Sequence, residues 1–509
     1  MAEHKSIYRG ENVRLTKPVS PLIVETCYPG PGKEINGRYA ELRQKLKAFH
    51  AFDKAHLVML YEQGHVTREE ARKMFGVFRD IEAEGMEDVR DDTHENMHSG
   101  EYLLTSRLGK EIGGKLHLGR SSGDLTALGN LFTMLRRETK LLEKFNEFRE
   151  ALLKKAEENI DTVMPAYTHG QHAQPMTFAH YLLSLVCKFD RDFDRLRCFF
   201  ERYDENPAGA AIISGSEFHL DQKRTAELLG FSRVSKNTLD AVWGRDWHLE
   251  AQADLTILFA NIAQMSEDLF VWSTSEFNLV EFADALCGTS SIMPQKKNCH
   301  AVQYLRGLSG IGAKYFVENV YVFKNPTGAP VMDGQRIMDD LWRGYDEATV
   351  AMPLATEMID TLTVNKDVMV ERAGHYWATA TDLAGEMVKE FDLPWRFAHQ
   401  IVGTTVRIAI ERQVLPLELT QDIVDEAAVL ATGKPLGMTT ENIRKALNPV
   451  NAVNNHDMIG GPAPVRIREE LAEHWAVLEK DKEWLAAKQQ QHKVAADKLE
   501  QAIDAILAD

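Results

Sequence analysis

Two long stretches of the chain place apolar residues at the spacing of a helix. Steps of three and four residues, with one step of seven, separate the apolar side chains of the first stretch, which are Leu128, Leu131, Leu135, Leu142, Phe145, Phe148, Leu152, Ala156 and Ile160. Such steps align side chains along one face of a helix. The pattern predicts one helix of about thirty residues, roughly 45 Å long, which Pro165 ends.

The second stretch covers residues 247–280 and contains neither proline nor glycine. Its apolar residues lie on several helical faces and include Leu255, Leu258, Phe259, Ile262, Leu269 and Phe270. A helix that is apolar all round is buried among other helices. Strand signals are scarce, and the best of them, VENVYVF at 317–323, fits a helix equally well. We therefore predict an all-α protein with a long central helix bundle, buried in part by partner subunits.

Composition narrows the class of protein. Hydrophobic residues make up 44% of the chain and charged residues 27%, which is typical of a soluble globular protein. The net charge of −17 argues against nucleic acid as a partner, because phosphate binding requires a basic surface. The chain has no apolar run of about eighteen residues, the length that a membrane span requires. We expect no membrane partner.

The cysteines indicate a reducing compartment. The chain has five, an odd number, and none forms a CxxC pair. This pattern argues against a disulfide framework and against a thiolate zinc site. The first fifteen residues, MAEHKSIYRGENVRL, lack the apolar core of a signal peptide. We therefore predict a cytoplasmic protein with free thiols.

The segment CGTSSIMPQKKNCH, residues 287–300, carries the most chemistry. Its small residues form a backbone that can approach a ligand closely. Two hydroxyls and an ammonium group nearby suit an anionic substrate. The same residues also fit a solvated loop with helix-capping serines and surface lysines.

Several segments of the chain resemble one enzyme family. GTSSIMPQKKN is similar to the GSSxMPxKxN signature of the fumarase/aspartase superfamily, and its QKK form resembles the argininosuccinate lyase branch. Other segments match that branch in the same order along the chain: KLHLGRSSGD from Lys115, MPAYTHGQHAQPMTFAHYLLS from Met164, NTLDAVWGRD from Asn237 and LPWRFAHQIVG from Leu393. The resemblance covers roughly residues 35 to 470.

The resemblance implies a fold and a reaction. The fold is an all-α, three-domain protein, with an N-terminal domain at 1–125, a long-helix bundle at 126–375 and a C-terminal domain at 376–509. It assembles as a homotetramer with a twenty-helix core, and each active site takes residues from three subunits. The reaction is β-elimination of fumarate from a substituted succinate. It uses no cofactor, and the chain shows no phosphate-binding or dinucleotide-binding motif.

The same resemblance implies roles for individual residues. Ser290 is the base, acting as its oxyanion, with Lys296 and loop amides to stabilise the negative charge. Lys296 and Asn298 hold the substrate carboxylate. Thr168 and His169 match the family's Thr-His pair, and His169 orients the substrate or assists proton transfer to the leaving group.

Three further residues are expected in the site. Ser121 and Arg245 are candidates for carboxylate binding, and His98 lines the side of the site formed by the first domain. His98 also belongs to HENMH, an HExxH sequence that zinc proteases use. A zinc protease requires a third ligand, and His117 is available, but LHLGRSSGD matches the lyase element better. We expect no metal.

The chain departs from the family pattern at four places. Ser122 and Gly123 replace the Arg and Asn of GRSRND, and His300 stands where the family has the acidic residue of NPD. Gln303 replaces the glutamate that pairs with the histidine, so it can orient His169 without stabilising an imidazolium by charge. NPTGAPVMDGQ, residues 325–335, replaces the family's arginine-recognition element.

These departures remove the arginine pocket. We predict a lyase that releases fumarate from an N-substituted aspartate other than argininosuccinate, and His300 suits an additional carboxylate. Two alternatives remain open: a carbon–oxygen lyase acting on an alkoxysuccinate, and a non-catalytic relative similar to the lens crystallins.

Overall fold

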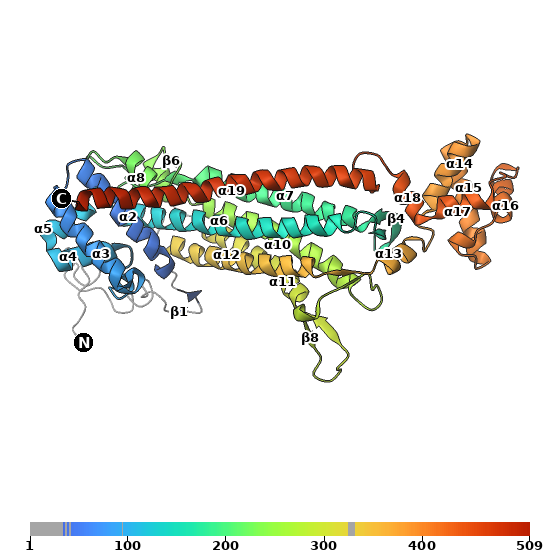
Figure 1. Cartoon of the computed structure of the whole chain (residues 1–509), viewed down its shortest axis with the longest axis horizontal. Coiled ribbons are helices and arrows are strands. Elements are labelled where there is room, and N and C mark those ends of the chain that lie inside the picture. Colours follow the sequence, from blue (N-terminus) through green and yellow to red (C-terminus); the bar gives the residue numbers. More distant parts are fainter. Residues whose placement is uncertain (1–33, 36–37, 40–41, 94, 324–330, 509) are drawn as a thin grey trace.

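The computed structural model describes residues 34–35, 38–39 and 42–508, apart from 94 and 324–330. Helices form most of this part, which confirms the predicted all-α class. Figure 1 shows an elongated body with a helical group at each end and a long bundle between them. The segment 325–335 that replaces the arginine-recognition element lies largely outside the described residues.

The central bundle consists of five long helices: α6 (Ser122–Glu157), α7 (Phe178–Tyr203), α10 (Asp246–Trp272), α11 (His300–Val322) and α12 (Val331–Asp360). The predicted apolar stripe of α6 is buried, and its Phe145 and Phe148 rings contact Phe189 of α7. The long helix is confirmed, but it ends at Glu157, well before Pro165, which lies in a strand.

The second apolar stretch is α10, which ends at Trp272 rather than at residue 280. Residues 317–322 belong to α11, so the strand alternative for VENVYVF is wrong. The helix α11 packs between α10 and α12. The segment continues the hydrogen-bonded helix from His300, so its β-branched composition does not decide its conformation.

The N-terminal group contains α2 (Leu42–Glu62), α3 (Arg68–Asp91), α4 (Ser99–Leu108), α5 (Lys110–Gly113) and two 3₁₀ turns, η1 (Asn96–His98) and η2 (Gly114–His117). Asp53 of α2 is fully buried between two arginines, at 2.8 Å from Arg90 and 2.6 Å from Arg120. The Arg90 pair holds α3 against α2, and the Arg120 pair holds the segment between η2 and α6 against α2. Two short helices, α8 (Gln222–Leu229) and α9 (Thr238–Trp243), lie beside α2 and α6 respectively.

The helices at the opposite end are α13 (Lys366–Ala373), α14 (Ala380–Phe391), α15 (Trp395–Glu411), α16 (Gln421–Thr432), α17 (Thr440–Leu447) and α18 (Pro449–Asn455), with the 3₁₀ turn η4 (Pro416–Glu418). Helices α14 to α17 share a core of their own. The last helix, α19 (Pro464–Leu507), instead runs back along the bundle to the N-terminal group (Figure 1). The predicted boundaries at 125 and 375 stay a prediction, although α19 packs with the bundle core.

The strands are short and form two-stranded pairs. They are β1 (Glu34–Ile35) with β2 (Arg38–Tyr39), β3 (Val163–Thr168) with β4 (Gln171–Thr177), β5 (Glu205–Asn206) with β6 (Arg233–Val234), β7 (Val280–Glu281) with β10 (Thr363–Val364), and β8 (Cys287–Thr289) with β9 (Lys297–Cys299). One 3₁₀ turn, η3 (Asp284–Leu286), precedes β8. Within the described residues, no helix is long and apolar enough to cross a membrane.

Candidate active site

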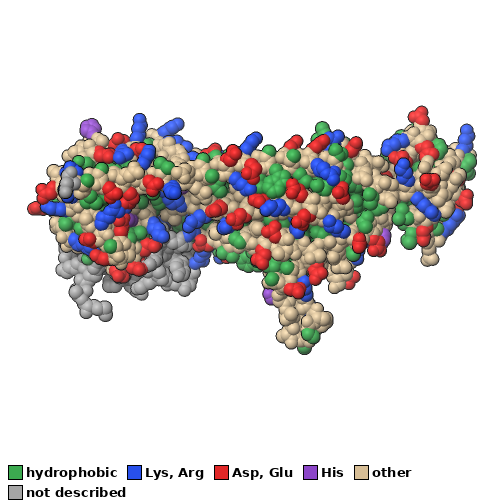
Figure 2. Space-filling view, viewed as in Figure 1, with side chains coloured by type: hydrophobic (Ala, Val, Ile, Leu, Met, Phe, Trp, Pro, Cys, Tyr) green, Lys and Arg blue, Asp and Glu red, His purple; other side chains and the backbone are tan. Residues whose placement is uncertain are grey.

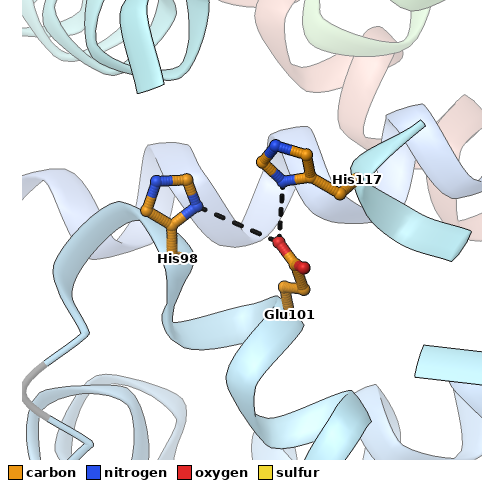
Figure 3. Close-up of side chains that lie close together, drawn as sticks. All are labelled: His98, Glu101 and His117. Carbon is orange, nitrogen blue, oxygen red and sulfur yellow. Dashed lines mark hydrogen bonds and ion pairs between the residues drawn. The ribbon is translucent and has the colours of Figure 1, made fainter. Parts of the chain in front are cut away.

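The first group of predicted site residues, His98, Ser121 and Ser122, lies where the N-terminal group meets the start of α6. Figure 3 shows His98 beside Glu101 and His117. Nε2 of His98 is 2.8 Å from the Ser122 hydroxyl, and Nδ1 of His117 donates to Glu101 at 2.7 Å. Nδ1 of His98 lies 4.0 Å from the same Glu101 oxygen. The carboxylate of Glu101 thus lies between two imidazoles, beside the first turn of α6.

The HExxH sequence does not form the helix that zinc proteases use. His98 ends the short 3₁₀ turn η1, Glu95 precedes it, and His94 lies outside the described residues. Ligand atoms of His98, Glu101 and His117 do lie within 4.8 Å of one another. This set would be compatible with a metal ion, and the expected absence of one stays a prediction.

Acidification is expected to destabilise the fold through His98. Burial, and next the charge of nearby His117, lower the pKa of His98 from 6.5 to about 4. Between these values the folded protein binds fewer protons than the unfolded chain, so stability falls as the pH falls. Lowering the pH from 7 to 5 is expected to cost about 2 kcal/mol at this group. Denaturant unfolding at both pH values measures this loss in the free energy of unfolding. The His98→Gln variant is expected to lack the share of the loss that comes from His98. An unchanged pH dependence in the variant would contradict the assignment.

The amino end of α6 holds Ser121 as its capping residue. The Ser121 hydroxyl accepts from the Gly123 amide at 3.1 Å, and Asp124 accepts from the Ser121 amide at 2.7 Å. A helix start of this kind favours anions. Helix α9 packs on the same end, and Arg245 follows it as the residue before α10.

A side chain from another loop fills the space beside Gly123. A Cβ atom at position 123 would lie 2.4 Å from Cδ1 of Ile212 and 3.2 Å from Val242. Ile212 has a positive φ of 79°, which is strained for a β-branched residue. The family's Asn at position 123 would therefore require the Ile212 side chain to move. Sequence reasoning identified the loss of Asn but had no signal for the residue that fills its place.

Thr168 and His169 lie at the tip of the β3–β4 hairpin. Thr168 pairs with Gln171, which leaves His169 and Gly170 as the two turn residues. Their φ angles of 54° and 72° are both positive, as a type I′ turn requires. This turn exposes His169 and Thr168 at the surface of this chain.

The signature segment forms a second hairpin, which projects from the body (Figures 1 and 2). Strands β8 and β9 pair Gly288 with Asn298, and residues 290–296 form the loop. The Ser290 hydroxyl accepts hydrogen bonds from the amides of Ile292 at 3.3 Å and Met293 at 3.1 Å. Two amide donors stabilise negative charge on this oxygen.

The two lysines of the hairpin have different surroundings. Lys297 pairs with Glu281 at 2.9 Å and Asp284 at 2.7 Å, and these hydrogen bonds, Asp284 first, raise its pKa. Lys296 is exposed, and the structure records no ion pair for it with any described residue. The imidazole of His300 packs directly on Gly288, where a Cβ would lie 2.3 Å from the ring. Gln303 is exposed on the first turn of α11.

The three groups do not meet within one chain. Helix α6 alone, with 36 residues, separates Ser121 from the β3–β4 hairpin by about 54 Å at ~1.5 Å per residue. The signature hairpin projects from a third position along the bundle (Figure 1). Among the described residues, no hydrogen bond or ion pair connects Ser290 to His169 or to Ser121.

Comparisons with known proteins agree with these motifs. The family described as Lyase matches residues 40–311, and the one described as Argininosuccinate lyase C-terminal matches 377–454. The argininosuccinate lyase of Methanosarcina barkeri is 37% identical over 86% of this chain and 88% of that protein. That of Methanospirillum hungatei is 38% identical with the same coverage.

A solved structure extends the likeness to the fold. EDDS lyase in complex with formate superimposes with a TM-score of 0.83 at 28% identity and covers 93% of this chain and 97% of that one. The fumarate lyase of Mesorhizobium sp. BNC1, at 18% identity and a TM-score of 0.69, shares the fold. The chain belongs to the argininosuccinate lyase-like branch of the fumarase/aspartase superfamily.

Proposed function

We propose that this lyase eliminates fumarate reversibly from an N-substituted aspartate other than argininosuccinate, with Ser290 as the base. The observation that carries this proposal is the pair of loop amides that donate to the Ser290 hydroxyl oxygen. A neutral serine is a weak base, and donors aimed at its oxygen lower the free energy of the alkoxide. Fumarate-releasing carbon–nitrogen elimination is the reaction of the branch to which the chain belongs.

The chemistry proceeds by proton removal and then loss of the amine. The Ser290 alkoxide takes a proton from the carbon next to the distal carboxylate of the aspartyl group. The electron pair delocalises into that carboxylate, then forms the double bond of fumarate as the carbon–nitrogen bond breaks. His169 assists the transfer of a proton to the amine as it leaves. Lys296 and Asn298 stabilise the doubly charged carboxylate, which requires preorganised positive charge.

We further propose a homotetramer in which each site combines Ser290, His169 and Ser121 from three subunits. The separation of the three groups within one chain supports this assembly. Exposed apolar residues on three bundle helices also support it: Ile257 of α10, Val317, Val320 and Tyr321 of α11, and Val350 of α12. Apolar side chains that gather on neighbouring helices are typical of a subunit interface.

The amine side of the substrate is proposed to lack a guanidinium. His300 lies against Gly288 in the stem of the signature hairpin, where the family carries an acidic residue. Ile212 fills the space of the family's Asn beside the start of α6. An imidazole and an apolar side chain in place of these groups favour a neutral or anionic amine substituent, and Arg245 and Ser122 are the candidates for binding its carboxylates.

The reverse reaction tests this proposal. Fumarate is incubated with the purified enzyme and a panel of amines and aminocarboxylates, with arginine included, and the ultraviolet absorbance of fumarate is followed. We expect consumption with at least one aminocarboxylate, and a rate with arginine at least about tenfold lower, since unpaired charge in a site costs more than 1.4 kcal/mol. Consumption with arginine alone would overturn the substrate assignment. No consumption with any amine would favour an oxygen leaving group or an inactive relative.

A further inference from the structure

A cluster of metal-ligating side chains lies between α7 and α19, away from all three groups of the lyase site. Sγ of Cys187 is 3.5 Å from Nε2 of His474 and 3.8 Å from a carboxylate oxygen of Glu470. The same Glu470 oxygen is 3.7 Å from Nε2 of His474. A sulfur, a nitrogen and an oxygen therefore form a nearly equilateral triangle.

The size of this triangle fits a zinc ion. Tetrahedral zinc binds sulfur at about 2.3 Å and nitrogen or oxygen at about 2.0 Å, which places ligand pairs with sulfur about 3.5 Å apart and a nitrogen–oxygen pair about 3.3 Å apart. The three distances in the structure depart from these values by no more than about 0.4 Å. Side-chain adjustments of that size would bring all three atoms into coordination.

The surroundings orient the histidine as in metal sites. Nδ1 of His474 donates to Asp190 at 2.6 Å, which points Nε2 at Cys187 and Glu470. Asp190 in turn accepts from the buried Arg149 at 2.5 Å. A carboxylate behind a ligating histidine sets its tautomer and raises its basicity.

Two rigid helices present the ligands. Glu470 and His474 are four residues apart on α19, and Cys187 and Asp190 are three apart on α7, so each pair lies on one helix face. The side chains of His474 and Glu470 are 14% and 27% exposed, so the cluster is in contact with solvent, which supplies water as a fourth ligand.

We propose that Cys187, Glu470 and His474 bind one zinc ion, which joins the C-terminal helix α19 to α7. The ligand set of one thiolate, one imidazole and one carboxylate suits zinc rather than calcium or magnesium. Without an ion, the hydrogen bonds of His474 to Asp190 and Cys187 and its ion pair with Glu470 hold the cluster together.

Cobalt substitution tests the site in the full-length protein. Metal-free enzyme is titrated with Co²⁺, and the thiolate-to-cobalt charge-transfer band in the near ultraviolet is followed. This band reports a cysteine ligand only, so binding at His98, Glu101 and His117 does not contribute. We expect a band that saturates near one equivalent per chain and that one equivalent of Zn²⁺ removes.

Matched variants decide the assignment. Cys187→Ser is expected to abolish the band, whereas Cys198→Ser, at the other half-buried cysteine of α7, keeps it. Asp190→Asn is expected to weaken Co²⁺ binding about 10–100-fold. Absence of the band in the parent protein, or an equal band in Cys187→Ser, would overturn the proposal. Circular dichroism and size-exclusion chromatography confirm that each variant is folded.

Discussion

Alanine in place of Ser290 is expected to lower kcat for fumarate release by about 10²–10⁴-fold, the contribution of a positioned proton-transfer group. The physical reason is the pair of amides that donate to the hydroxyl oxygen, since an alanine leaves them without an acceptor and removes the proton acceptor itself. Initial rates with the substrate that the amine panel identifies measure the loss. Size-exclusion chromatography and circular dichroism are expected to match the parent protein, because the hairpin projects from the body.

The neighbouring serine is the matched control for this experiment. Ser291 occupies the next position of the same exposed loop, and the two amide hydrogen bonds go to Ser290. Ser291→Ala is therefore expected to stay within about tenfold of the parent rate, well short of the loss expected for a base. If Ser291→Ala abolished turnover and Ser290→Ala did not, the base would be Ser291.

The contacts within the signature hairpin distinguish the roles of its two lysines, Lys296 and Lys297. Glu281 and Asp284 neutralise Lys297, so its ammonium is committed to the stem of the hairpin. Lys296 has no such pair among the described residues, so in the proposed mechanism it is the lysine that stabilises the substrate carboxylate and the Ser290 alkoxide. The motif alone places two lysines side by side, whereas the contacts distinguish them.

Local patterns were sufficient to predict much of the fold. The apolar spacing of α6 predicts a long buried helix because each buried side chain repeats with the helical period. The predicted helix ends were less accurate. Pro165 is the predicted end of the first helix, but α6 ends at Glu157 and Pro165 lies in a strand of the hairpin that follows. The segment 317–322 was ambiguous because its partners, α10 and α12, come from elsewhere in the sequence.

Contacts between distant segments could not be predicted. Ile212 fills the space beside Gly123, and no periodicity relates the two residues. Cys187 and His474 are 287 residues apart, so cysteine spacing predicted no thiolate zinc site, and the site that we propose opposes that expectation. Motifs identify ligands that lie close along the chain, whereas helix packing creates sites from ligands that lie far apart.

Two inactive variants are expected to restore activity when they share one tetramer. Ser290→Ala and His169→Ala each remove one group of the site, and in the proposed assembly these groups come from different subunits. In random tetramers from equal amounts of both variants, half of the sites receive an intact Ser290 and half of those an intact His169. About a quarter of the parent activity is therefore expected to return, starting from almost none in either variant alone. Co-expression with two different affinity tags isolates the mixed tetramers for the rate measurement.

A second pair of variants tests whether the recovery depends on the subunit origin of the residues. Thr168 and His169 are adjacent in one hairpin, so every site takes both from the same chain. Mixed tetramers of Thr168→Ala and His169→Ala contain no site with both residues intact, and we expect no gain over the separate variants. Recovery in the first pair but not in the second requires a site shared between subunits. Failure of the first pair in isolated mixed tetramers would overturn the shared site, because it would mean that Ser290 and His169 serve the same site from one chain or that one of them has no role in the reaction.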